Sequence, residues 1–172
     1  MSDDATCLVD VETEDEGWST AVADVESCAR LAAETALHRV GGGAVVILLT
    51  DDLTIRDLNR RFRGKDLATN VLSFPAAPLP GDHAEAGVSG DIALALGVCR
   101  AEALGQGLRL ADHLAHLVIH GVLHLAGHDH HDDAEAIEME TIETALLAAL
   151  GIADPYRHED LGAVAVSELA HG

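Results

Sequence analysis

The sequence has few cysteines and lacks long apolar runs, and each shortage excludes a class of protein. Its three cysteines are odd in number and widely spaced, without a Cys-x2-Cys pair, which argues against a disulfide scaffold and a zinc finger. No apolar run has the length of a membrane span, and the acidic start MSDDATCLVD is unlike the basic start of a signal peptide. We therefore expect a cytoplasmic protein with a single domain over residues 1–172 and its core at about 6–151.

Basic residues are scarce too, yet half of them fall in one short stretch. Ten Lys and Arg stand against 30 Asp and Glu, a formal net charge of −20 that repels nucleic acid in general, and no DNA partner is expected. Half of the ten basic side chains lie between positions 56 and 65, namely Arg56, Arg60, Arg61, Arg63 and Lys65. In so acidic a chain this cluster is a candidate anion site, and the alternative is a solvated helix face.

The spacing of apolar residues predicts alternating strands and helices. The run AVVILLT (44–50) is typical of a buried strand. The expected strands span residues 6–12, 44–50, 71–75 and 90–96. The expected helices span residues 18–40, 52–62, 97–106, 110–126 and 134–150, with Ser19 capping the first and Asp51 or Asp52 the second. Four strands among about five helices indicate an α/β fold in one layered domain.

The stretch HGVLHLAGHDH (120–130) carries the strongest chemical signal in the chain. On a helix, His120 and His124 are four residues apart, so their imidazoles share one face. Gly127 is suited to ending that helix in a left-handed turn, after which His130 can approach from the loop side. Three imidazoles with one open position are the ligand set of a catalytic zinc, although copper, nickel or iron also accept them.

Two alternatives to this interpretation arise from the same stretch. The spacing His-x3-His-x2-Gly-x2-His is also that of the metzincin peptidases, but their general base, a Glu directly after the first His, is Gly121 here. The neighbouring His128 and His131 are interpreted as exposed loop residues, although either could replace His130 as a ligand. The sequence thus predicts a metal site without the proton-transfer group of a peptidase.

Two long segments together resemble the signatures of the YbeY family. They are LNRRFRGKDLATNVLSFP (58–75) and HLVIHGVLHLAGHDH (116–130), with GDIALAL (90–96) between them at the matching place. The similarity covers roughly residues 44–150 and leaves the acidic extensions at both ends outside. The chain departs from the family pattern at Ala68, where Pro is common, and at Phe62 and His128, where Tyr is found.

The resemblance implies a fold, an activity and a set of site residues. Members are metal-dependent endoribonucleases that cleave single-stranded RNA, with roles in 16S rRNA 3′-end maturation and ribosome quality control, and with the ribosome or its proteins as partners. The resemblance implies a small mixed sheet flanked by helices, one zinc ion on His120, His124 and His130, and a functionally required arginine at Arg63. The competing hypotheses are a zinc peptidase and a ribosome-associated module in which the metal only stabilises the fold.

A mechanism follows as a hypothesis from these residues. The scissile phosphate would lie between the metal and Arg63, whose guanidinium stays charged and can donate two hydrogen bonds. No residue is identified as the general base, since Asp129 is better suited to orienting a ligating imidazole. The chain has only four aromatic residues besides histidine, so we expect base stacking to contribute little and phosphate contacts to dominate binding.

Overall fold

The computed structural model describes residues 6–76, 87–128 and 132–155. The chain divides into two compact units, Met1–His128 and Asp129–Gly172, which we describe separately. The expectation of a single domain therefore stays a prediction. In the described part of the chain, no helix combines the length and the apolar character needed to span a membrane.

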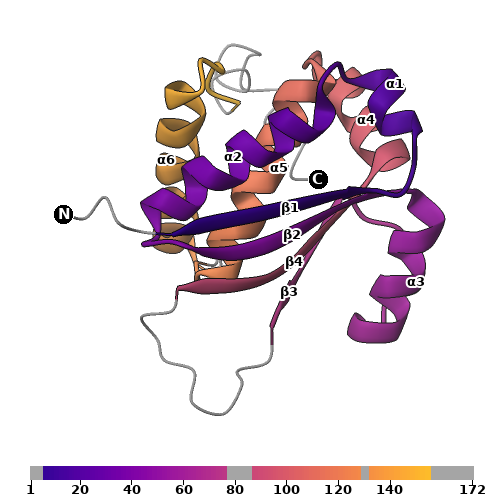
Figure 1. The fold of residues 1–172 in the computed structure, drawn as a ribbon, viewed down its shortest axis with the longest axis horizontal. Helices are drawn as coiled ribbons and strands as arrows, with labels where there is room; N and C mark the ends of the chain where they lie inside the picture. The colour runs from indigo at the N-terminus through magenta and orange to yellow at the C-terminus, as the bar shows by residue number, and fades with distance from the viewer. Residues whose placement is uncertain (1–5, 77–86, 129–131, 156–172) are drawn as a thin grey trace. The chain divides into compact units, whose positions relative to one another are not determined.

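The first unit is built on a four-stranded mixed sheet, which confirms the predicted fold class (Figure 1). The strands lie in the order β1-β2-β4-β3. β1 and β2 pair in parallel, as do β2 and β4, while β3 runs antiparallel to β4 at one edge. The strand bounds are β1 Cys7–Thr13, β2 Gly43–Thr50, β3 Val71–Pro75 and β4 Val88–Ala95. Each strand begins and ends within two residues of its predicted position.

Five helices accompany this sheet in the described part of the first unit. Their bounds are α1 Gly17–Ala21, α2 Val25–Arg39, α3 Asp52–Arg63, α4 Leu96–Gln106 and α5 Leu110–Leu125. Figure 1 shows α2 and α5 on one side of the sheet and α3 on the other, at one end. The two faces of the sheet are therefore covered unequally, and the groove described below lies on the face of α3.

The burial of β2 reflects the unequal cover. Val45, Ile47 and Leu49 are almost fully buried on the side of α2 and α5. Val46 and Leu48, which point the other way, are only partly buried. The run AVVILLT predicted a buried strand, and one of its two faces is instead partly open. α3 covers only part of that face, where its Ile55 packs with Leu72 and Ala93 in a small second core.

The expectation of one helix over residues 18–40 is wrong, because two helices form there. Asp24 takes a left-handed conformation (φ 53°), which breaks the helical path between α1 and α2. Trp18 is fully buried and its indole Nε1 donates to the Thr50 carbonyl at 2.9 Å, so α1 is fixed to the end of β2. The N-cap position of α1 is Glu16, and Ser19 lies inside the helix, so the prediction that Ser19 caps it is wrong.

The expected cap of α3 is confirmed at Asp51. Its Oδ1 accepts a hydrogen bond from the Thr54 backbone N–H at 2.7 Å, which satisfies one of the free donors in the first turn. This hydrogen bond is the largest of the effects that lower the pKa of the Asp51 carboxyl.

The second unit contains one described helix, α6 Asp133–Ala149, within one residue of its predicted bounds. Asp132 caps its start by accepting from the Glu135 N–H at 2.8 Å. Gly151, just past the end, takes a left-handed conformation (φ 79°). With α6 the described residues hold six helices, one more than expected, because of the break at Asp24.

Candidate active site

The histidine pair lies near the end of α5, a helix that packs against the sheet. Leu114, Val118 and Val122 on one side of α5 are fully buried. His120 and His124 are partly exposed, and their ring centroids lie 4.7 Å apart. The prediction that two imidazoles four residues apart would come together on one helix face is thereby confirmed. Two adjacent, partly exposed imidazoles are a donor set that suits zinc and related metal ions.

The predicted left-handed turn after α5 is also confirmed. Gly127 has φ 100°, a conformation that a residue with a side chain rarely adopts. The Gly127 N–H donates to the His124 carbonyl and the His128 N–H donates to the Leu123 carbonyl, both at 3.0 Å. These two bonds form the common glycine-terminated helix end, and they turn the chain immediately after the second histidine.

The third predicted ligand, His130, lies outside the described residues, as do Asp129 and His131. In residues 6–76, 87–128 and 132–155, no group of three or more His, Cys, Asp or Glu side chains is arranged to hold a metal ion. The described part of the chain therefore provides two of the three proposed ligands, His120 and His124. The assignment of His130 and the alternative assignment of His128 both stay predictions.

Gly121 follows His120 and lies where α5 closely approaches the sheet. A Cβ at this position would lie 3.0 Å from Ile92 Cγ2 and 3.2 Å from Ser73 Oγ, closer than side chains normally approach. The position thus faces the sheet, so a side chain there requires Ile92, Ser73 or the helix to shift. A glutamate at position 121, the general base of a metzincin peptidase, would point into this packed contact.

Arg63 is the last residue of α3, and it reaches across to β3. Its Nη2 donates to the Ser73 carbonyl at 2.5 Å. Its guanidinium carbon lies 5.7 Å from the centroid of the Phe74 ring, within range of a cation–π contact. The side chain is nevertheless exposed, so its remaining N–H groups can bind an anion.

The other arginines of the basic cluster are paired with carboxylates. Arg56 contacts Asp66 at 2.9 Å, and Arg60 and Arg61 contact Asp57 at 2.5 and 3.2 Å. Hydrogen bonds from the arginines lower the pKa of both Asp57 and Asp66. Exposed pairs of this kind add little stability, but the two carboxylates together offset two of the three arginine charges. The interpretation of these three as a solvated helix face is therefore supported.

The two remaining basic groups of the cluster differ from these three. Among the described residues, neither Arg63 nor Lys65 forms an ion pair with a carboxylate. They are thus the two cluster members without a carboxylate partner in the described part of the chain. This difference separates Arg63 and Lys65 from the other three, and Arg63 in addition contacts Ser73 of β3.

Ser73 connects the arginine to the histidine helix. Its carbonyl accepts from Arg63, and its hydroxyl donates to the Gly121 carbonyl at 3.3 Å. Gly121 is the direct neighbour of His120, so one residue of β3 contacts both Arg63 and the backbone beside the first histidine. The two predicted functional elements, far apart in the sequence, meet at this strand.

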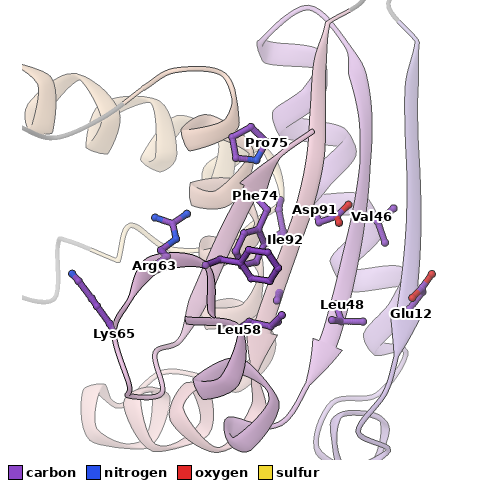
Figure 2. Close-up of a pocket in the computed structure, with 12 residues that line it drawn as sticks. Glu12, Val46, Leu48, Leu58, Arg63, Lys65, Phe74, Pro75, Asp91 and Ile92 are labelled. Atoms are coloured by element: carbon purple, nitrogen blue, oxygen red, sulfur yellow. The ribbon is translucent and has the colours of Figure 1, made fainter. Parts of the chain in front are cut away.

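A groove of about 920 Å³ opens beside Arg63, on the face of the sheet that α3 covers only in part. Val46 and Leu48 of β2 form part of its apolar floor (Figure 2). Arg63 and Lys65 lie on one side of the groove, and Glu12 and Asp91 lie on the other. The sequence did not predict this groove, because its walls come from four strands and one helix that only the sheet order brings together.

The protein is a small α/β protein with a candidate metal and phosphate site. The site combines the paired imidazoles of α5 with an arginine that contacts the edge strand of the mixed sheet. The family model described as Endoribonuclease YbeY matches residues 9–151. The chain belongs to the YbeY endoribonuclease family.

Relatives from several bacteria support this membership. The chain is 52% identical to Endoribonuclease YbeY of Paramagnetospirillum magneticum, over 81% of this chain and 89% of that protein. It is 50% identical to the protein of the same name from Azorhizobium caulinodans, over 86% and 95% of the two chains. The solution structure of TM1509 from Thermotoga maritima is similar in fold, with a TM-score of 0.54 at 23% identity, over 90% of this chain and 93% of that one.

Proposed function

We propose that this chain is a zinc-dependent endoribonuclease that cleaves single-stranded RNA. The observation that carries the proposal is the connection from Arg63 through Ser73 to the helix of His120 and His124. Cleavage of a phosphodiester needs a group that binds the phosphate and a group that offsets its growing negative charge. A guanidinium next to a candidate metal site provides both. Family membership supports the same activity, since the relatives named above are endoribonucleases.

His120 and His124 would hold the zinc ion together with His130. When bound, zinc polarises a phosphoryl oxygen and lowers the pKa of water. Arg63 binds the scissile phosphate with the N–H groups that its contact with Ser73 leaves available, and it offsets the negative charge that builds up in the transition state. The hydrogen bond to Ser73 fixes the direction of the guanidinium before the substrate arrives.

The experiment compares Arg63→Ala with Arg56→Ala, a matched control on the same helix whose arginine is paired with Asp66. We expect Arg63→Ala to lose about 10²-fold or more in cleavage of a single-stranded RNA, with the metal content and melting temperature unchanged. Arg56→Ala should stay within a few-fold of the wild type. Arg63→Lys should recover only part of the loss, because lysine lacks the planar fork of donors.

The metal assignment has its own readout. Elemental analysis should find about one zinc per chain, and His124→Ala should lose the metal and the activity together. Unchanged metal content in His124→Ala would refute the ligand assignment. A zinc-loaded wild type that binds RNA without cleaving it at any salt concentration would favour the non-catalytic ribosome-associated module.

In the cell, we propose that the substrate is the 3′ region of 16S rRNA, in maturation and ribosome quality control in the cytoplasm. The ribosome or its proteins would then direct a nuclease with few specific base contacts. Mapping 16S rRNA 3′ ends with and without the protein tests this role. Correctly matured ends in its absence would refute it, even if the purified protein cleaves RNA.

A further inference from the structure

Two of the chain's few aromatic side chains meet beside Arg63. The rings of Phe62 on α3 and Phe74 on β3 lie edge to face, with their centroids 5.6 Å apart. Phe74 is partly buried in the sheet, whereas Phe62 is 62% exposed although it lines the groove. A phenylalanine that contacts a second ring and is still largely exposed presents an aromatic surface to solvent.

Two arginines lie at this aromatic pair: Arg61, which is paired with Asp57, and Arg63, which forms no ion pair among the described residues. The guanidinium of Arg61 lies 5.5 Å from the Phe62 ring centroid, and that of Arg63 lies 5.7 Å from the Phe74 ring centroid. Aromatic rings next to arginines are what single-stranded nucleic acids bind, since the bases stack on the rings while the cations contact the phosphates. The structure thus has both parts of such a site within one groove.

The charges across the groove determine which part of a nucleotide can enter it. Glu12 and Asp91 are exposed carboxylates on the side away from Arg63 and Lys65 (Figure 2). They repel phosphate, so the RNA backbone is confined to the basic side. A neutral base can extend over the apolar floor, and its N–H groups can donate to the carboxylates.

We propose that this groove binds one unstacked nucleobase of the RNA, which stacks on Phe62 while the adjoining phosphate contacts Arg63. The proposal rests on the proposed function for the identity of the polymer. It also revises the expectation that base stacking contributes little. That expectation rested on the small number of aromatic residues in the sequence. Two of them, Phe62 and Phe74, lie together beside Arg63.

The test uses the full, zinc-loaded chain and a single-stranded RNA oligonucleotide with one mapped cleavage position. A series of oligonucleotides replaces one nucleotide at a time by an abasic ribose. Phe62→Leu keeps an apolar side chain without the ring, and Phe62→Trp keeps an aromatic surface. Leu53→Ala is the matched control, because Leu53 is 75% exposed on the same helix but does not line the groove.

We expect one abasic position to raise the KM of the wild type by about 5- to 100-fold, the effect of one stacked base. Phe62→Leu should show a similar rise with the intact RNA, little change in kcat, and no further loss at that abasic position. Phe62→Trp should retain the abasic effect that Phe62→Leu loses, and Leu53→Ala should behave like the wild type. This pattern assigns the lost binding to contact between the ring and the base.

Several outcomes would overturn the proposal. One is that Phe62→Leu cleaves the intact RNA as well as the wild type, which would leave the groove to a protein partner. Another is that the variant loses the same factor on every oligonucleotide, which would make Phe62 a support for Arg63. If the wild type cleaves no RNA, the proposed function fails. The same comparison by fluorescence anisotropy, with binding constants in place of KM, then decides for or against the base site.

Discussion

Gly121→Ala tests the close packing that connects the histidine helix to the sheet. The added Cβ would meet Ile92 Cγ2 at 3.0 Å, Ile92 Cδ1 at 3.1 Å and Ser73 Oγ at 3.2 Å. Overfilling a packed site costs about 1–3 kcal/mol. Replacing glycine by alanine within a helix gains about 0.5–1 kcal/mol. The packing cost should prevail, so we expect a net loss of up to about 2.5 kcal/mol in the free energy of unfolding.

The matched control is Gly105→Ala in α4, where no atom lies within 4 Å of the added Cβ. That variant should gain about 0.5–1 kcal/mol, because only the helix preference changes. Urea unfolding of both variants, with metal removed by a chelator, measures the difference without a contribution from metal binding. If Gly121→Ala is stabilised as much as Gly105→Ala, the close approach of α5 to β3 and β4 is wrong.

Two further predictions concern the cap of α3 and the buried thiol. Asp51→Ala should lower the free energy of unfolding at pH 7 by about 1 kcal/mol, whereas Asp51→Asn, which keeps an acceptor, should lose less. Because folding lowers the pKa of Asp51, its ionised form stabilises the fold above the unfolded-state pKa near 4. The difference between wild type and Asp51→Ala should therefore shrink as the pH falls through the lower folded-state pKa, and a constant difference from pH 7 to pH 2 would contradict this account. Burial raises the pKa of Cys99 to about 12. A thiol reagent at pH 8 should therefore leave Cys99 unmodified and react with the partly exposed Cys28, as measured by mass spectrometry. Modification of Cys99 in the folded protein would contradict its burial.

Much of the fold could be predicted because its signals are local. The apolar pattern located every strand within two residues, and the cap of α3 was narrowed to Asp51 or Asp52 from their place before an amphipathic helix. The break between α1 and α2 was missed because the left-handed conformation of Asp24 has no glycine or proline to signal it. The partly open face of β2 was missed because a run of apolar residues does not tell which face a helix will cover.

The candidate site divides in the same way. His120 and His124 come together because a helix places residues four apart on one face, which the spacing alone predicts. Nothing local distinguished Arg63 within its basic cluster, and the family resemblance selected it. The ion pairs of its neighbours and its own contact with Ser73 now give a physical reason for that choice. The pairing of Phe62 with a residue of β3 depends on long-range packing that no spacing rule includes.

The edge position of β3 has a consequence for self-association. β3 bonds to β4 at its two ends, through the Asn70 carbonyl and the Ala76 N–H. By strand alternation, the backbone groups of Val71, Ser73 and Pro75 face away from the sheet. Exposed edges of this kind can recruit a strand from another chain and start aggregation.

Each of these three outward positions has one backbone group that is occupied or missing. The Val71 N–H donates to the Asn70 side chain at 2.6 Å, the Ser73 carbonyl is covered by Arg63, and Pro75 has no N–H to offer. The residue proposed to bind RNA thus also shields the edge against strand addition. Arg63→Ala would expose one backbone acceptor there, so we expect the purified variant to be less soluble than the wild type.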